Sequence, residues 1–423
     1  MRIGFWLGDA IAEHGGIAPY AQRVLAALIG DAEPGWRIVL LCGNDLPSQI
    51  KQLAAEHPGL VEISFIPDST AVKPRSPLLN KIGARFKRRE PPQSPSWDYL
   101  QQWFDRLALD LLHFPTQTLL HPDMQTPYCL TMYGVRELPH LSPPVPYLIT
   151  MHDVQELHFP ENFTPAQRAI RAVHYWKALE KAGVVVVSFD HVKQDLIKYF
   201  GLPEDKVYVC PIPFREISLT APTVAAAQSY STKYDQWHPF LLYPAHTWRH
   251  KNHLRLFHAL REVRRRDGQN LKLICTGGIE HHYHAEVLAQ VAELGLSDAV
   301  LFSGIIPEDE LRWLYEGAAL VTIPTKYEAG SFPLFEAMML GSPVICSDVT
   351  SLPETIGDHR FAFDPDNTEV LSNLIFRMLT DTVFRQENLS NSAAQAERLR
   401  KVNAAAYFYE AYRKLLATLP LST

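Results

Sequence analysis

Two glutamates eight positions apart are the residues of this chain whose spacing most suggests chemistry. Glu328 and Glu336 stand on either side of a small polar turn in residues 325–348, which read TKYEAGSFPLFEAMMLGSPVICSD. A carboxylate accepts hydrogen bonds from neighbouring hydroxyl groups such as those of a sugar. It also repels a phosphate, so two carboxylates at this turn indicate a ligand that carries more than one kind of group.

The turn between the glutamates predicts the start of a helix. Ser331 is a good N-cap residue, Pro333 suits the first helical turn, and Gly341 is a natural residue at the C-terminal end. The N–H groups of Gly330, Ser331 and Phe332 at such a helix start form a ready phosphate site. The stretch therefore indicates a ligand with phosphate in the middle and a sugar at each end. The alternative is a helix start that carries acidic residues only for dipole reasons.

The first half of the chain alternates short apolar runs with helical patterns. The apolar runs show little polar alternation, as expected of parallel strands that helices cover on both faces. A helix is predicted over residues 18–29, with Tyr20, Val24 and Leu28 on one face. This order is typical of a doubly wound α/β domain over residues 1–212. Its strands are predicted at residues 2–7, 36–42, 61–66, 109–114, 146–151, 183–188 and 206–210.

The same pattern restarts in the second half of the chain. Residues 213–238 are rich in Pro, Ser, Thr and Ala with weak periodicity, which predicts a linker. A second Rossmann-like domain follows over residues 239–403, and a last helix over 404–423 is expected to pack back on the first domain. We expect the two domains to face each other across a central cleft formed by the C-terminal ends of both sheets. The strands of the second domain are predicted at residues 239–245, 271–278, 299–304, 320–324 and 343–348.

Composition and charge exclude several classes of protein. The 423 residues suit two domains of roughly 200 residues each. A net charge of −6 gives no reason to expect nucleic acid as a partner. No run approaches the roughly 20 apolar residues that span a bilayer, and the chain starts directly with a strand-like run, so no signal peptide is expected. We therefore expect a cytoplasmic protein with buried free thiols at Cys42, Cys129, Cys210, Cys275 and Cys346.

A Pro-rich insertion at about residues 68–96 departs from this rhythm. Between Lys73 and Arg89 it carries a series of Lys and Arg residues, with Leu, Ile and Phe at roughly helical spacing among them. Such a basic amphipathic surface suits an anionic membrane face, which would place the protein peripherally at the inner side of the membrane. The alternative is a solvated insertion without a partner.

The motif EAGSFPLFEAMMLGSPVI at residues 328–345 resembles the Glu-x7-Glu motif of retaining GT-B glycosyltransferases of the family-4 type. The family pattern reads roughly Glu-Gly-Phe-Gly, an aliphatic or aromatic residue, Pro-x-x-Glu-Ala-Met, and then Gly-x-Pro-Val. This chain keeps both glutamates, the Pro, Glu-Ala-Met and Gly-Ser-Pro-Val. It has Ala329, Gly330 and Ser331 in place of Gly-Phe-Gly, so the aromatic residue of the family is moved or lost.

The resemblance implies roles for residues of the second domain. It implies that Glu328 faces the transferred sugar and that Glu336 binds the ribose of the nucleotide. The run LLYPAHTWRHKNH resembles the first strand of the family's donor domain and its Lys-Asn pair, which implies Lys251 on the diphosphate and Asn252 as the cap of the next helix. The family often has a second cation upstream of that Lys, and here it must be Arg249 or be absent.

Other segments match the family in the right order. The run YLITMHDV resembles a strand that ends in His-Asp at the cleft, which implies His152 near the reaction centre. The run LGDAIAEHGGIAPY resembles the first glycine loop, with Gly15 and Gly16 close to the donor phosphate. The run AVLFSGIIPEDEL resembles the segment that frames the nucleobase, with Gly304 and Ile305 beside it.

Two further clusters have simpler interpretations. Asp364 and Asp366 resemble an Asp-x-Asp metal site of a different glycosyltransferase fold, but they stand in a Pro turn, and turn chemistry explains them. The spacing of His281, His282 and His284 does not place all three on one helix face, so a surface cluster is expected and not a zinc site.

Across about residues 8–365, the resemblance implies transfer of a sugar from a nucleotide diphosphate donor, GDP- or UDP-linked, to a hydroxyl group. The acceptor would be a glycan, a lipid-linked molecule or a small molecule, as in polysaccharide biosynthesis. Two segments look most like those of enzymes that use GDP-mannose, and UDP-sugars remain open. No metal or cofactor is expected, because a fixed cation and a helix start can stabilise the leaving group. The alternatives are a nucleotide-sugar 2-epimerase of the same fold and a non-catalytic sugar-nucleotide-binding protein.

Overall fold

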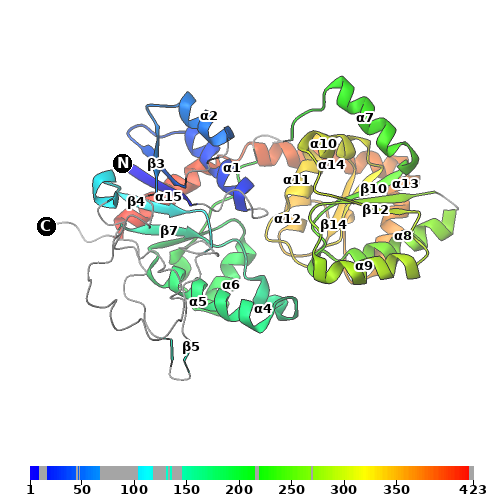
Figure 1. Ribbon diagram of the computed structural model, residues 1–423, viewed down its shortest axis with the longest axis horizontal. Helices are drawn as coiled ribbons and strands as arrows, with labels where there is room; N and C mark the ends of the chain where they lie inside the picture. The colour runs from blue at the N-terminus through cyan, green and yellow to red at the C-terminus, as the bar shows by residue number, and fades with distance from the viewer. Residues whose placement is uncertain are drawn as a thin grey trace, which may run out of the picture. The chain divides into compact units, whose positions relative to one another are not determined.

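The chain folds into two compact units (Figure 1). Unit 1 comprises Met1–Val154, Pro165–Ile212 and Asn403–Thr423, and unit 2 comprises Gln155–Thr164 and Pro213–Val402. Gly15, Gly16, Cys129 and the basic segment Lys73–Arg89 lie outside the described residues. The computed structural model describes residues 1–8, 17–43, 46, 48–66, 103–117, 130–131, 134–135, 145–214, 219–267 and 270–418.

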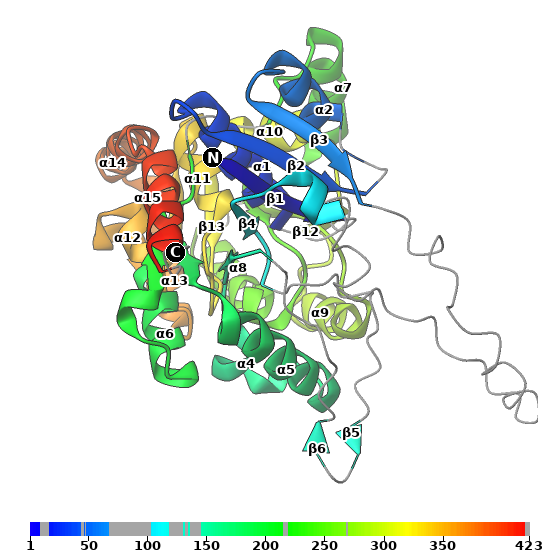
Figure 2. The same cartoon turned by 90° about the vertical axis from the view of Figure 1, so that its left-hand side faces the viewer.

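Unit 1 is built on a parallel seven-stranded sheet in the order β3-β2-β1-β4-β7-β8-β9. The strands are buried apolar runs, because helices cover the sheet on both faces. Figure 2 shows β1, β2 and β3 side by side. The strands are β1 (Arg2–Gly8), β2 (Arg37–Cys42), β3 (Val61–Phe65), β4 (Leu111–Phe114), β7 (Tyr147–Thr150), β8 (Val184–Val187) and β9 (Val207–Val209), besides a separate antiparallel pair, β5 (Leu130–Thr131) and β6 (Gly134–Val135).

The C-terminal helix of the chain belongs to unit 1. The hydroxyl of Tyr409 on α15 donates to the carbonyl oxygen of Leu28 on α1 at 2.9 Å, and Tyr20, Val24 and Leu28 are buried as predicted. Helix α15 therefore packs against α1 and shares its hydrophobic core. Among its described residues, unit 1 has the helices α1 (Ile17–Gly30), α2 (Ser48–Glu56), α5 (Pro165–Lys181), α6 (Asp190–Phe200), η6 (Glu204–Lys206) and α15 (Ala404–Ala417), and residues 103–107 are helical as well.

Unit 2 is built on a parallel six-stranded sheet in the order β12-β11-β10-β13-β14-β15. Helices α8 and α9 lie on one face of this sheet, and α10 and α11 lie on the other (Figure 1). The strands are β10 (Phe240–Pro244), β11 (Lys272–Thr276), β12 (Val300–Gly304), β13 (Leu320–Ile323), β14 (Val344–Ser347) and β15 (Ala362–Phe363). The helices are α4 (Gln155–His158), η5 (Pro160–Asn162), α7 (Val224–Tyr234), η7 (Asp235–Trp237), η8 (Arg249–Lys251), α8 (His253–Asp267), α9 (His281–Glu293), α10 (Glu308–Gly317), α11 (Phe332–Leu340), α12 (Leu352–Ile356), η9 (His359–Phe361), α13 (Thr368–Thr380) and α14 (Thr382–Arg400).

Residues 213–238, predicted as a linker, instead hold α7 and belong to unit 2. Polar contacts attach α7 to α10: Tyr234 and Lys233 both donate to Glu310, at 2.5 and 2.6 Å. Tyr234 is the one residue of α7 that is fully buried. The linker prediction failed because a helix held by polar side chains shows no apolar periodicity.

The predicted fold class is confirmed: two Rossmann-like α/β units contain a strand at each predicted position. Within the described ranges, no helix is long and apolar enough to cross a membrane. The predicted buried free thiols are confirmed for the four cysteines that the structure describes, Cys42, Cys210, Cys275 and Cys346.

Candidate active site

The strand order of unit 2 reverses between β10 and β13, so the connections that leave these neighbouring strands run in opposite directions. Ligands of open α/β sheets bind outside the carboxyl ends of the strands at such a reversal. Lys251 ends η8 in the loop after β10, and Glu328 lies in the loop between β13 and α11. Two of the expected catalytic side chains therefore stand where the topology predicts a ligand.

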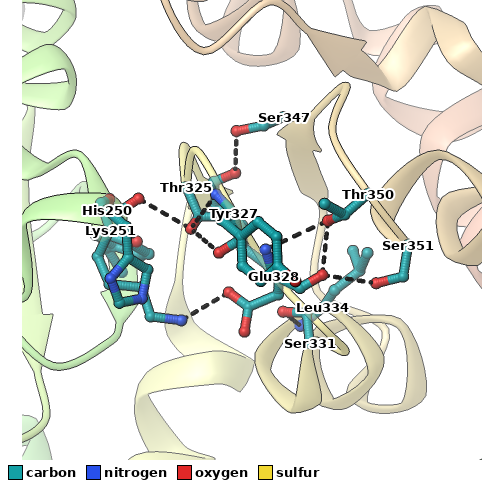
Figure 3. Close-up of polar contacts among 12 residues, drawn as sticks. His250, Lys251, Thr325, Tyr327, Glu328, Ser331, Leu334, Ser347, Thr350 and Ser351 are labelled. Carbon is teal, nitrogen blue, oxygen red and sulfur yellow. Dashed lines mark hydrogen bonds and ion pairs between the residues drawn. The ribbon is translucent and has the colours of Figure 1, made fainter. Parts of the chain in front are cut away.

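Lys251 and Glu328 contact each other directly (Figure 3). The Nζ atom of Lys251 lies 2.6 Å from Oε2 of Glu328, and the two side chains are 15% and 14% exposed. A charge-assisted hydrogen bond between partly desolvated groups is stronger than an ion pair in water. Because an ammonium group has three N–H donors, one bond to Glu328 leaves two for the oxygen atoms of a ligand.

The backbone of Glu328 is held by residues that follow β14. The hydroxyl of Thr350 lies 2.6 Å from the carbonyl oxygen of Glu328 and 3.3 Å from its N–H nitrogen, and the hydroxyl of Ser351 lies 3.3 Å from the same carbonyl (Figure 3). Thr350 has a φ of +50°, a left-handed conformation that is unusual for a β-branched residue. These contacts offset the strain at Thr350 and fix the direction of the Glu328 side chain.

Asn252 locks the loop that carries Lys251. It has a φ of +61°, which Asn tolerates better than most residues, and its side-chain amide donates to the carbonyl oxygens of Pro324 and Pro365, both at 2.9 Å. The hydroxyl of Tyr243 donates to the carbonyl of Lys251 at 2.7 Å. Asn252 directly precedes α8, and its backbone carbonyl accepts from the N–H of Arg255 at 3.1 Å, while its side-chain amide joins the loops after β13 and β15.

A second set of contacts joins the loop of Glu328 to the loop of Lys251. The N–H of Lys326 donates to the carbonyl of His250 at 2.7 Å, and the buried hydroxyl of Thr325 lies 3.1 Å from the same carbonyl (Figure 3). The two loops are thus tied together at the backbone on both sides of the ion pair. This rigidity suits a site that must hold charges in place before a ligand arrives.

Helix α11 starts as predicted. The Oγ atom of Ser331 accepts from the N–H of Leu334 at 3.3 Å, Pro333 stands in the first turn, and Gly341 ends the helix with a φ of +70°. Figure 3 shows Ser331 beside the side chain of Glu328. The predicted phosphate site at this helix start therefore adjoins the Lys251–Glu328 pair.

Glu336 lies one turn inside α11 and accepts a hydrogen bond from the hydroxyl of Tyr315 at 2.9 Å. Tyr315 is fully buried on α10, and its burial together with the charge of Glu336 raises the pKa of its phenol well above the usual value. Tyr315 therefore stays a hydrogen-bond donor and orients the Glu336 carboxylate. Of the residues that precede Glu336, Phe332 packs edge-on against Phe214, with ring centroids 5.9 Å apart.

Two histidines beside Lys251 stay neutral. Burial, followed by the charge of Lys251, lowers the pKa of His250 to about 2 and that of His253 to about 3. His253 is fully buried against Tyr243, with ring centroids 4.7 Å apart. These imidazoles therefore add no positive charge to the site near pH 7, and Lys251 supplies it.

Arg249, expected as a second cation for the donor, is engaged elsewhere. Its guanidinium donates to both carboxylate oxygens of Glu286, at 2.6 and 3.2 Å, and lies 4.5 Å from the ring centroid of Tyr283. Both partners are on α9. The structure thus does not bring Arg249 to the Lys251–Glu328 pair.

The two residues expected beside the nucleobase lie at the carboxyl end of β12, where Gly304 is the last residue of the strand and Ile305 follows it. Gly304 has a φ of +70°, and its carbonyl accepts from the N–H of Gly277 in the loop after β11 at 2.8 Å. Ile305 is 81% exposed, so a large apolar side chain stands uncovered at the carboxyl end of the sheet. Such a side chain suits the flat face of a base.

His152 lies in unit 1, after β7. Its Nε2–H donates to the carbonyl of Pro115 at 3.0 Å, and its ring meets the ring of Tyr20 edge-on, 4.7 Å between centroids. Burial lowers the pKa of His152, although the bond to Pro115 and the charge of Asp153 act in the opposite direction. The imidazole is therefore neutral at pH 7 and keeps Nδ1 as its acceptor.

Comparison with known proteins agrees with this geometry. Residues 231–402, most of unit 2, match the family model described as glycosyl transferases group 1. The O-antigen chain mannosyltransferase B of Escherichia coli is 27% identical over 243 residues, which are 56% of this chain and 62% of that protein. The chain thus matches less than two thirds of the length of this relative.

Solved structures match along nearly the whole chain. Sucrose-phosphate synthase of Thermosynechococcus elongatus superposes with a TM-score of 0.67 at 19% identity, covering 99% of this chain and 100% of that one. HepE of Anabaena in complex with UDP-glucose superposes with a TM-score of 0.63 at 18% identity and the same coverage. The chain has a GT-B fold, and its residues 231–402 resemble group 1 glycosyl transferases.

Asp364 and Asp366 form the turn expected from the sequence, whereas the side chains of His281 and His282 lie outside those that the structure describes. The N–H of Asp366 donates to Oδ1 of Asp364 at 2.8 Å, which is an ordinary turn contact, and the Asp366 carboxylate pairs with Lys326 at 2.6 Å. Within the part of the chain that the structure describes, no group of three His, Cys, Asp or Glu side chains could hold a metal ion.

Three residues that position the site of this GT-B chain were not predicted from the sequence. Thr350 and Thr325 hold the loop of Glu328, and Tyr315 orients Glu336. Polar residues directly after a buried strand were the available signal for Thr350 and Thr325. Tyr315 gave no such signal, because a Tyr on the buried face of a helix is an ordinary core residue.

Proposed function

We propose that this GT-B chain transfers a sugar from a nucleoside diphosphate sugar to a hydroxyl group of a glycan, with retention at the anomeric carbon. One observation carries the proposal: Lys251 and Glu328 meet at 2.6 Å at the strand reversal, beside the helix start capped by Ser331. A cation and a helix N-terminus suit two phosphates, and a carboxylate suits sugar hydroxyls. All three are present within two adjoining loops.

The departure of the nucleoside diphosphate is the step that these groups assist. The bond between the anomeric carbon and the diphosphate oxygen breaks, and its electron pair goes to that oxygen. Lys251 and the start of α11 stabilise the new negative charge, an effect often worth about 3 kcal/mol for one well-placed donor. The acceptor hydroxyl attacks from the same face and gives its proton to the leaving phosphate. This account needs no metal ion and no cofactor.

The two glutamates take the two sugar rings of the donor. Glu328 accepts from hydroxyls of the transferred sugar, and Lys251 remains bonded to it while its other N–H groups reach the diphosphate. Glu336, oriented by Tyr315, accepts from the ribose hydroxyls. The exposed side chain of Ile305 packs against the base.

We assign to unit 1 the residue His152 and the binding of the acceptor glycan. With Nε2–H bonded to Pro115, Nδ1 of His152 accepts a hydrogen bond from a hydroxyl of the transferred sugar. The O-antigen chain mannosyltransferase of Escherichia coli supports mannose as that sugar. The two segments that look most like those of GDP-mannose enzymes, residues 150–163 and 243–253, support GDP as its carrier. The Lys and Arg residues between Lys73 and Arg89 support contact with an anionic membrane face, where a lipid-linked acceptor would be found.

Nucleotide binding and product analysis test the proposal. Thermal unfolding is followed with GDP, UDP and ADP, because a ligand at 100 times its dissociation constant stabilises by about 2.7 kcal/mol. The chain is then incubated with GDP-mannose and a mannose-terminated glycan, with and without EDTA, and the new linkage is assigned by NMR. We expect GDP to stabilise most and an α-linked product to form in EDTA. An epimerised donor without acceptor, or donor binding without any consumption, would replace this proposal by one of the two alternatives.

A further inference from the structure

Unit 2 contains a cavity lined by residues of η5, α8, α9 and the loops that follow β10 and β13. Its volume is about 420 Å³, which is within the range of small-molecule sites. Its lining includes Phe159 and Asn162, Arg249 and Tyr283, and Lys326. Neither Lys251 nor Glu328 is among its lining residues, so this cavity differs from the candidate active site.

The cations at this cavity are already matched by carboxylates. Arg249 is bonded to both oxygens of Glu286. Lys326 lies 2.6 Å from Asp366, and Arg255 lies 3.8 Å from the same carboxylate. A phosphate or another anion would have to displace a carboxylate from each of these cations. The charges therefore favour a ligand that is neutral and polar.

The remaining lining residues define the chemistry of that ligand. The amides of Asn162 and Gln290 offer donors and acceptors, as does the Arg249–Glu286 pair, and the rings of Phe159 and Tyr283 are apolar surfaces among them. A hydroxyl group both donates and accepts, so a molecule with many hydroxyls can use adjacent donors and acceptors. A base or another flat apolar ligand prefers a mostly apolar pocket. The lining is thus suited to a saccharide.

The cavity adjoins the candidate active site through the backbone of both loops. His250 and Asn252, which flank Lys251, line the cavity, and Lys326 precedes Glu328 by two residues. We propose that this cavity binds a saccharide unit of the acceptor glycan, remote from the hydroxyl that reacts. The inference rests on the proposed glycosyl transfer and assigns part of acceptor recognition to unit 2. It also gives Arg249 a role in place of the donor contact expected from the sequence.

A matched pair of substitutions tests this site. Gln290→Trp fills the cavity from α9, whereas Gln228→Trp makes the same change on the exposed face of α7 in the same unit. Binding of α-mannotetraose to the full chain, saturated with GDP, is measured by calorimetry, with maltotetraose and inorganic phosphate as further probes. We expect mannotetraose to bind, and its affinity to fall at least about tenfold in Gln290→Trp and to stay unchanged in Gln228→Trp. A second variant, Asn162→Ala, removes one amide without filling space and is expected to weaken binding by about fivefold.

Transfer kinetics complete the test. In Gln290→Trp, the KM of a tetrasaccharide acceptor should rise at least about tenfold, while kcat, the donor KM and the KM of methyl α-mannoside stay unchanged. Absence of mannotetraose binding, binding that Gln290→Trp leaves intact, or phosphate binding at the cavity in place of saccharide would overturn the inference. If the chain transfers no sugar but Gln290→Trp still abolishes mannotetraose binding, the proposed transfer fails and the saccharide site stands. Normal transfer with no effect of Gln290→Trp leaves the transfer intact and removes only this inference.

Discussion

Lys251 and Glu328 stand 77 residues apart in the chain and meet at 2.6 Å. This contact explains how a carboxylate can lie next to a helix start that suits phosphate. The ammonium group compensates the carboxylate while no ligand is bound, and its two other N–H groups remain for the ligand. The pair therefore presents an acceptor for hydroxyls and a donor for phosphate at a single position.

Glu328→Gln should separate binding of the nucleotide from turnover. The amide has nearly the same shape but no charge, so Lys251 is released from its ionic partner and repulsion of the diphosphate disappears. We expect GDP to bind about tenfold more tightly, while mannose transfer falls by about two orders of magnitude or more. Calorimetry with GDP and a transfer assay measure the two effects. Unchanged GDP affinity would show that the carboxylate does not repel the nearby diphosphate, and unchanged transfer would show that it does not contact the transferred sugar.

Lys251→Ala should remove the cation that stabilises the leaving group. We expect turnover to fall by about 10²- to 10³-fold, together with weaker GDP binding and an intact fold by circular dichroism. Lys233→Ala is the matched control, because Lys233 also bonds to a carboxylate of unit 2, that of Glu310 at 2.6 Å, but on α7. Near-normal transfer by Lys251→Ala would remove this account of the leaving group.

Tyr315→Phe should affect the donor ribose and little else. The substitution removes the hydrogen bond of 2.9 Å that orients Glu336 and costs about 1 kcal/mol of folding free energy. We expect the donor KM to rise several-fold with kcat nearly unchanged. Tyr230→Phe, which removes a 2.9 Å bond to Asp309 on another face, is the control for loss of a Tyr–carboxylate bond alone. Equal donor KM values in the two variants would contradict the ribose role of Glu336.

His152→Ala should lower transfer by orders of magnitude without unfolding unit 1. Because burial lowers the pKa of His152, its imidazole is neutral in the folded chain, and its contribution should not vary between pH 7 and pH 9. His57→Ala, on an exposed loop of the same unit, is the control. Full activity of His152→Ala in a transfer assay would exclude a contact between His152 and the sugar.

The stability of unit 2 should fall as the pH drops below about 6.5. His250 and His253 have folded pKa values of about 2 and about 3, so only the unfolded chain takes up protons at these residues between about pH 6 and pH 4. Because the unfolded state binds more protons at these histidines, a lower pH favours unfolding. The loss of unfolding free energy is absent above the pKa of histidine in the unfolded chain, about 6.5, and grows as the pH falls below it. Together the two histidines contribute roughly 2.7 kcal/mol per pH unit in this window.

The variant His253→Phe tests this pH dependence. Neither ring nitrogen of His253 has a hydrogen-bond partner among the described residues, and its neighbours Tyr243 and Phe257 are aromatic. Phe should therefore be tolerated, and the slope of unfolding free energy against pH should decrease by roughly 1.4 kcal/mol per pH unit. Urea unfolding between pH 4 and pH 7 measures this slope. An identical slope in the wild type and the variant would contradict the assignment.

Local features of the fold were accessible from the sequence. Ser331, Pro333 and Gly341 marked the ends of α11 because capping and left-handed conformations depend on the residue itself and its nearest neighbours. Apolar runs marked the parallel strands because burial on both faces excludes polar residues. The helix α7 was not predicted, because it has no apolar periodicity. Hydrogen bonds of Tyr234 and Lys233 with Glu310 attach it to α10.

The sequence by itself therefore determined the two Rossmann-like units. It also indicated Lys251, Glu328 and Glu336 as candidate site residues, without showing which of them are in contact. Only the tertiary structure decided that Lys251 bonds to Glu328 and that Arg249 bonds to Glu286. The physical reason is that residue preferences act over a few positions along the chain. Contacts between loops depend on which strands are neighbours, and it is the reversal of strand order between β10 and β13 that makes the loops of Lys251 and Glu328 meet.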